Sequence, residues 1–164
     1  ILSEAALRPW SPESPMPHNP ATVISARQWA LLFVGWLLAV VSMAGSLFLS
    51  EVMDYAPCVL CWYQRIPMYA LALILGIALW TQDVHVVKYA QPLALVGVAL
   101  AAFHCLLYLG YIPKGIQPCS QDVPCSDVKL QIWGFLTIPL MSLIAFLAIV
   151  VVLFLLNRRS HEEK

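Results

Sequence analysis

Four long apolar stretches constrain the fold of this chain more than any other feature. They are Trp29–Leu49, Ile66–Trp80 with its flanks, Val86–Tyr108 and Ile132–Leu156. A helix needs about 20 apolar residues to cross the hydrocarbon core of a bilayer, and a segment in lipid must satisfy its own backbone hydrogen bonds. We therefore expect four transmembrane helices packed as a bundle.

The composition supports a membrane protein of the all-α class. Of the 164 residues, 61% are hydrophobic and only 11% are charged. The mean hydropathy of +0.80 is too high for a soluble globular domain. The formal net charge is zero and the basic residues are dispersed, which argues against nucleic acid as a partner.

The domain organisation follows from the spans and their flanks. Residues 1–22 carry five prolines among polar residues, so we expect a disordered N-terminal arm. Residues 23–158 are predicted to form the four-helix transmembrane domain, and residues 159–164 a cytoplasmic tail. The first span is expected to be retained, because Ser50-Glu51 after it is not a small-residue signal cleavage site.

The distribution of Lys and Arg predicts the orientation in the membrane. If both termini are cytoplasmic, six basic residues lie in cytoplasmic segments and three on the opposite side. Basic residues are preferentially retained in the cytoplasm. The loops over residues 50–64 and 109–131 are then extracytoplasmic, where thiols meet an oxidising environment.

Four of the five cysteines form two pairs in these loops, Cys58 with Cys61 and Cys119 with Cys125. Structural disulfides closing such short loops would each contribute only roughly 2 kcal/mol. A zinc site is a second alternative, but the second pair is spaced wider than a usual half-site and neither loop contains a histidine. We favour a third reading, in which the two pairs exchange electrons.

The second apolar stretch is short unless residues 60–63 belong to the same helix, which places the Cys-x-x-Cys at the helix entrance. Pro57 suits the first position of a helix, so Cys58 and Cys61 are predicted to lie in the first turn. Free backbone N–H groups and the helix dipole stabilise a thiolate there. The thiolate is the form that attacks a disulfide.

Arg65 lies four residues beyond Cys61 and therefore on the same helical face. One reading is an interfacial anchor that keeps its charged head in water. The other is a cation that stabilises negative charge on Cys61 or on a reduced carbonyl compound beside it. Trp62 either lines such a pocket or belongs to the interfacial aromatic belt.

The segment Pro57-Cys-Val-Leu-Cys-Trp-Tyr-Gln-Arg65, followed by a cysteine pair in the second external loop, resembles the DsbB/BdbC family of disulfide-bond-formation proteins. These are four-helix membrane thiol–quinone oxidoreductases. The resemblance extends from about Arg27 to Leu156, and Ile132–Pro139 is similar to the family's last-helix start. The short spacing between the loop cysteines resembles BdbC-like members.

This resemblance implies an electron relay. A reduced thioredoxin-fold partner of the DsbA or BdbD kind would attack the Cys119–Cys125 disulfide, with Cys119 forming the mixed disulfide. Cys125 would then exchange with Cys58. Cys61 would face a membrane quinone, either ubiquinone or menaquinone, with Arg65 and Trp62 beside it. We expect a monomer in the cell membrane, with no bound metal.

The third span contributes two further residues. His104 is a candidate hydrogen-bond donor to the quinone, because ionisable groups within spans are functional candidates, or it bonds a carbonyl of a neighbouring helix. Cys105 is expected to pack as a small inert hydrophobe.

Two alternative functions stay open. Vitamin K epoxide reductase also combines a loop pair with a membrane-edge Cys-x-x-Cys, although its loop cysteines come first in the chain. A non-enzymatic metal-binding membrane subunit would use the thiols as ligands.

Overall fold

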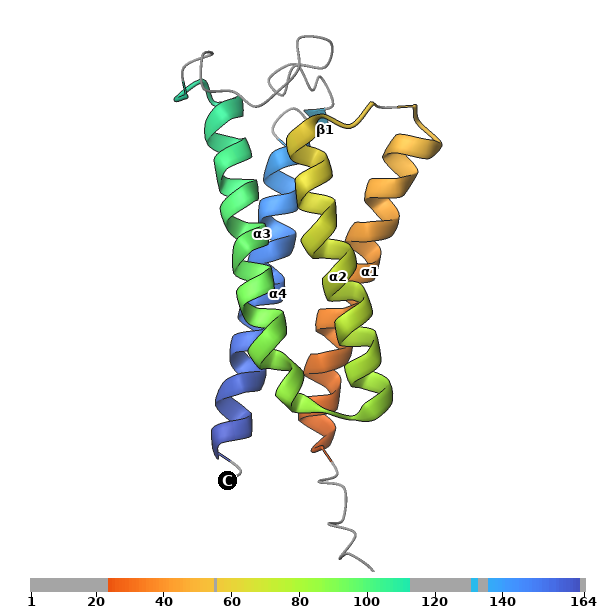
Figure 1. The fold of residues 1–164 in the computed structure, drawn as a ribbon, viewed down its shortest axis with the longest axis vertical. Helices are drawn as coiled ribbons and strands as arrows, with labels where there is room; N and C mark the ends of the chain where they lie inside the picture. Colours follow the sequence, from red (N-terminus) through yellow and green to blue (C-terminus); the bar gives the residue numbers. More distant parts are fainter. Residues whose placement is uncertain (1–23, 55, 113–130, 133–135, 163–164) are drawn as a thin grey trace, which may run out of the picture.

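Four long helices run alongside one another in a bundle (Figure 1). The computed structural model describes residues 24–54, 56–112, 131–132 and 136–162. The long helices are α1 (Ala26–Glu51), α2 (Val59–Thr81), α3 (Val87–Tyr108) and α4 (Ile138–Glu162). Each of α1 and α3 packs against both α2 and α4, so the four helices surround a shared core. The predicted fold class is confirmed.

The outer faces of the helices are apolar. Val41, Leu73 and Ile77 are each more than 60% exposed, at 61%, 69% and 64%. An apolar surface running along every helix is unfavourable in water and suits contact with lipid. All four helices are long and apolar enough to cross a membrane, with mean hydropathies between 1.3 and 3.0.

The bundle core combines large apolar side chains with small residues that let helices approach. Phe146 of α4 is fully buried and lies against Gly97 of α3, where an added Cβ would overlap the phenyl ring. Ala94 and Ala101 of α3 are also fully buried. Small residues at helix interfaces are the usual means of close packing between transmembrane helices, where no hydrophobic effect favours association.

The helix boundaries agree with the predicted spans except at the last one. Helix α4 begins at Ile138, not Ile132, and Pro139 is its second residue, where the missing N–H costs no helical hydrogen bond. The preceding residues form a short antiparallel pair, β1 (Gln131–Ile132) with β2 (Leu136–Thr137), that the sequence did not predict. Helix α4 also continues to Glu162, into the segment predicted as a tail.

The other ends have clear local causes. Helix α1 starts with a capping box in which Ser25 Oγ accepts from the Gln28 N–H and Gln28 Oε1 accepts from the Ser25 N–H. Helix α2 includes residues 60–63, as its length required. A short 3-10 helix, η1 (Val84–Val86), connects α2 to α3 and is capped by Asp83.

The arrangement places the cysteine motif at one end of the bundle. The start of α2 lies at the end where α1 and α3 finish, whereas the start of α1 and the finish of α4 lie at the opposite end (Figure 1). The predicted N-terminal arm, as well as Cys119 and Cys125, lies outside the described residues.

Candidate active site

Cys58 is the N-cap of helix α2, and its sulfur accepts a hydrogen bond from the Cys61 backbone N–H at 3.3 Å. This corrects the predicted position of Pro57, which precedes the cap and is not the first helical residue. Cys61 is the third residue of the helix. The N-cap sulfur therefore takes the place of the usual serine or aspartate oxygen and satisfies a free N–H of the first turn.

The two sulfur atoms of this motif lie in direct contact. Cys58 Sγ and Cys61 Sγ are 2.8 Å apart, and both thiols are free. Cys58 is only 2% exposed, whereas Cys61 is half-buried. A small movement joins or separates the two sulfurs, so the pair can interconvert between a dithiol and a disulfide, with the transfer of two electrons.

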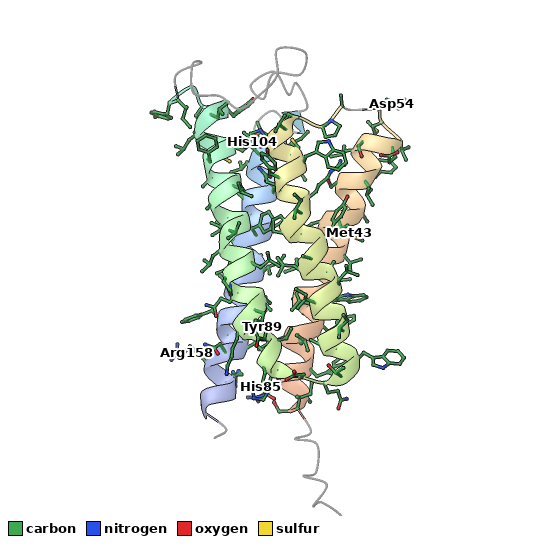
Figure 2. The ribbon with its side chains drawn as sticks, viewed as in Figure 1. Met43, Asp54, His85, Tyr89, His104 and Arg158 are labelled. Carbon is green, nitrogen blue, oxygen red and sulfur yellow. The ribbon has the colours of Figure 1, made fainter. Side chains whose placement is uncertain are left out.

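His104 reaches this pair from helix α3. Its side chain is fully buried, and Nε2 lies 3.8 Å from Cys58 Sγ. Figure 2 shows His104 at the end of the bundle where α2 begins. The other ring nitrogen, Nδ1, lies 3.0 Å from Gln64 Nε2. The described side-chain partners of His104 are therefore two side chains of the α2 segment and not a helix carbonyl.

Two polar residues that the sequence reasoning missed complete this contact. Gln64 of α2 is buried, and its Oε1 lies 2.6 Å from Ser142 Oγ of α4. A glutamine inside an apolar span was a signal that could have been used, since polar side chains in membrane helices tend to bond across helices. Ser142 gave a weaker signal, because serine often bonds a carbonyl of its own helix, as it also does here to Pro139 at 2.9 Å.

Arg65 is buried and bonded to helix α1. Its exposed fraction is 8%, its Nε donates to Ser46 Oγ at 2.9 Å, and one terminal nitrogen donates to the Ser46 carbonyl at 2.9 Å. The guanidinium also lies 5.2 Å from the centre of the Trp62 ring. The reading of Arg65 as an anchor with its head in water is therefore wrong. Ser46 is a third residue that the sequence did not single out.

The remaining predicted residues lie at different distances from this cluster. Trp62 is 56% exposed on the outer face of α2. Cys105 is half-buried. Its thiol does not belong to the cluster formed by the side chains of Cys58, Cys61 and His104. The structural description does not extend to Cys119 or Cys125.

The thiols and the imidazole also resemble part of a metal site. The ligand atoms of Cys58, Cys61 and His104 all lie within 4.8 Å of one another. In a tetrahedral zinc site with Zn–S bonds of about 2.3 Å, two thiolates lie about 3.8 Å apart. The sulfurs here are 2.8 Å apart and would have to separate to share an ion. The arrangement fits a redox dithiol better.

A bundle of membrane-spanning helices with a buried dithiol at one end defines a class of protein, the membrane proteins that carry redox-active thiols. Comparison with known proteins specifies the family. The family model described as "Disulfide bond formation protein DsbB" matches residues 26–156. The chain belongs to this family.

Curated relatives agree with that assignment. A "Probable disulfide formation protein" of Metapseudomonas resinovorans is 44% identical over 137 residues, covering 83% of this chain and 95% of the relative. The "Disulfide bond formation protein C" of Bacillus subtilis is 44% identical over 131 residues, covering 80% and 95%. No solved structure matches the chain significantly. The protein is thus a multi-pass membrane oxidoreductase of the disulfide-generating kind.

Proposed function

We propose that this protein reoxidises a thioredoxin-fold thiol oxidase and passes the electrons to a membrane quinone. Cys119 and Cys125 would receive the electrons from the partner, and Cys58 and Cys61 would pass them on. The observation that carries this proposal is the contact between the Cys58 and Cys61 sulfurs at the end of a membrane-spanning helix. A dithiol at the end of a membrane-spanning helix could exchange with the cysteine pair predicted in the second loop and also pass electrons to a lipid-soluble acceptor.

The thiol steps balance as two exchanges. A partner thiolate attacks the Cys119–Cys125 disulfide, and the second partner thiolate displaces Cys119, which leaves an oxidised partner and a reduced loop pair. The loop pair then reduces the Cys58–Cys61 disulfide in the same way. Each exchange moves two electrons and leaves the number of disulfides unchanged. A net disulfide is produced only when an external acceptor takes the electron pair.

The residues around Cys61 fit a quinone as that acceptor. A bound quinone would accept two electrons and two protons from the dithiol. Arg65 supplies a buried cation one turn beyond Cys61, and Tyr69, one turn further, carries a buried hydroxyl without a hydrogen-bond partner among the described residues. Both groups can donate hydrogen bonds to a quinone carbonyl oxygen. Exposed Trp62 provides an aromatic face beside them.

His104 was the other predicted quinone ligand, and its described contacts connect it to sulfur. Its Nε2 lies against Cys58 and its Nδ1 against Gln64. In the proposed function His104 therefore acts on the dithiol, while Arg65 and Tyr69 hold the quinone.

The proposed orientation has both termini in the cytoplasm and the cysteine end outside. The count of basic residues supports it, and so does the placement of the start of α1 and the finish of α4 at the end opposite the dithiol (Figure 1). The membrane then separates the exported substrates, whose disulfides are formed, from the reducing cytoplasm.

A coupled assay tests the function. The purified protein in lipid nanodiscs is mixed with a reduced thioredoxin-fold oxidase and either ubiquinone or menaquinone, and quinone absorbance is followed. We expect quinone reduction that requires the donor and proceeds equally with Cys105→Ser, which keeps the dithiol. If neither quinone is reduced by the wild-type protein, the proposed acceptor is wrong.

A further inference from the structure

A continuous path of polar side chains leads from helix α4 to the Cys58 sulfur. Ser142 Oγ lies 2.6 Å from Gln64 Oε1, Gln64 Nε2 lies 3.0 Å from His104 Nδ1, and His104 Nε2 lies 3.8 Å from Cys58 Sγ. The path uses one residue from each of α4, α2 and α3 before it reaches the N-cap of α2. The three contacts join residues that are 78, 40 and 46 positions apart in the sequence.

The direction of donation along this path is fixed by the chemistry of each group. The Ser142 hydroxyl has one proton and two acceptors nearby, and Gln64 Oε1 at 2.6 Å is closer than the Pro139 carbonyl at 2.9 Å. With its oxygen occupied by Ser142, Gln64 presents its amide N–H to His104 Nδ1. That nitrogen must then be the acceptor, so a neutral imidazole carries its proton on Nε2. The Nε2–H is directed at Cys58 Sγ.

The surroundings of Cys58 explain why its sulfur needs a donor. Its side chain is 2% exposed and clusters with buried Leu60 and Leu107, with Phe103 and Ile112 packed against them. Removal of water disfavours a thiolate. Among the described residues, the titratable groups that face this sulfur are Cys61 from the start of α2 and His104 from α3. The Arg65 cation lies one helical turn beyond Cys61.

We propose that Gln64 and Ser142 are positioning residues that hold His104 as the Nε2–H tautomer, so that this N–H stabilises the Cys58 thiolate during disulfide exchange. The inference rests on the proposed function for the exchange itself. No covalent bond to His104 forms or breaks in this role. A hydrogen bond to a charged sulfur strengthens as the charge develops, so the contact favours the states in which Cys58 is an attacking or leaving thiolate.

The hydrogen bonds at Cys58 are consistent with this role. The hydrogen bond from the Cys61 thiol lowers the pKa of Cys58, burial opposes this, and the His104 and Cys61 N–H contacts lower it further, to about 4. Because the pKa is depressed, the thiolate is present above this pH and is lost as the pH falls through it. The alkylation rate of Cys58 should therefore change little between about pH 5 and pH 8.

The first experiment measures the tautomer directly. Protein labelled with nitrogen-15 in its four histidines is reduced, and the two ring nitrogens of His104 are identified from the signals lost in His104→Gln. We expect the Nε2–H form in the wild type and a shift toward a mixture in Gln64→Met, which keeps the side-chain length but removes the amide oxygen and nitrogen. A wild-type spectrum showing the Nδ1–H form would overturn the inference.

The second experiment measures the pH profile of Cys58 alkylation by iodoacetamide, with each cysteine quantified by mass spectrometry. Loss of a hydrogen bond to a charged group should lower the ionisation constant roughly tenfold, so we expect the reactivity of Cys58 in Gln64→Met to fall off about one pH unit higher than in the wild type, with little change at neutral pH. Ser142→Ala should have a smaller effect in the same direction. Ser50→Ala is the matched control, since Ser50 Oγ bonds carbonyls of its own helix. An unchanged profile in Gln64→Met contradicts the inference.

A third variant separates this role from simple packing. His104→Gln places an amide N–H near the position of Nε2 and should retain most of the reactivity of Cys58 at low pH, whereas His104→Leu should lose it. Equal profiles in these two variants would show that the imidazole only fills space. These measurements need neither quinone nor partner, so the inference and the proposed function can fail separately.

Discussion

The cysteine end and the middle of the bundle differ in how their helices are held together. At the cysteine end, Gln64, Arg65 and His104 are buried polar side chains, and their hydrogen bonds connect α2 to the other three long helices. Along the middle, buried apolar side chains such as Leu71 and Phe146 pack against one another and against small residues. Buried polar groups are costly in an apolar medium unless each one is paired.

The comparison indicates a division of labour. The middle of the bundle holds the helices together by close packing of apolar side chains. The cysteine end places charge and hydrogen-bond donors around two sulfur atoms. Substitutions at the polar end should therefore change chemistry more than stability, and substitutions in the middle should do the reverse. Four substitutions test that contrast.

Cys61→Ser should abolish quinone-dependent oxidation of the partner, because a hydroxyl cannot form the disulfide through which the electron pair passes. Stability should change by no more than about 0.5 kcal/mol, since the replacement is nearly isosteric and the site is only half-buried. Quinone reduction and thermal unfolding are measured on the same preparation. Oxidation at the normal rate in this variant would remove Cys61 from the relay.

Gly97→Ala should destabilise the bundle by about 1–3 kcal/mol, because the new methyl group overlaps the ring of Phe146. Gly45→Ala is the matched control on α1, where nothing lies within 4 Å of the added Cβ, and it should be neutral or slightly stabilising. Thermal unfolding in detergent compares the two. Activity per folded molecule should stay normal in both, and a specific loss of activity in Gly97→Ala would break the proposed contrast.

Arg65→Met should raise the apparent KM for quinone about tenfold, since a charged donor is lost near the proposed quinone position. Ser46→Ala should have a smaller effect, because Arg65 keeps its bond to the Ser46 carbonyl. Steady-state kinetics with varied quinone measures both. If KM is unchanged and only thermal stability falls, Arg65 serves to join α1 to α2 and has no part in quinone binding.

Asp83→Ala should have the smallest effect, about 0.5 kcal/mol of stability at neutral pH, through loss of a cap at the far end of the bundle. The His85 backbone N–H lowers the pKa of Asp83, so its contribution is present at neutral pH and is lost as the pH falls through that pKa. Asp83→Asn should retain the cap. Thermal unfolding at neutral and acidic pH measures this, and a change in quinone kinetics would mean that the two ends are coupled.

Sequence alone was sufficient for the features that depend on local pattern. Continuous apolar runs predicted the four helices, and the spacing of Cys58 and Cys61 predicted a helix-entrance dithiol. The start of α4 was missed because an apolar run does not distinguish a helix from the short extended pair that precedes Pro139.

The contacts around the dithiol could not be predicted in the same way. Ser46, His104 and Ser142 meet residues of α2 across 19, 40 and 78 positions of sequence. These contacts depend on how each helix is rotated about its axis in the bundle. A single polar residue in an apolar span does not specify that rotation. The zinc alternative illustrates the point, since it was discounted partly because neither loop has a histidine, and the structure brings His104 to the cysteines from another helix.

In the proposed function, two dithiols of this chain deliver electron pairs to quinone through Cys58 and Cys61. A single-turnover titration tests it most directly, with fully reduced protein mixed with excess quinone in the absence of oxygen and of any partner. We expect two quinones to be reduced per protein, one for each dithiol, and one in a variant with Cys119→Ser and Cys125→Ser. No quinone reduced by the wild type, or two reduced by that variant, would contradict it.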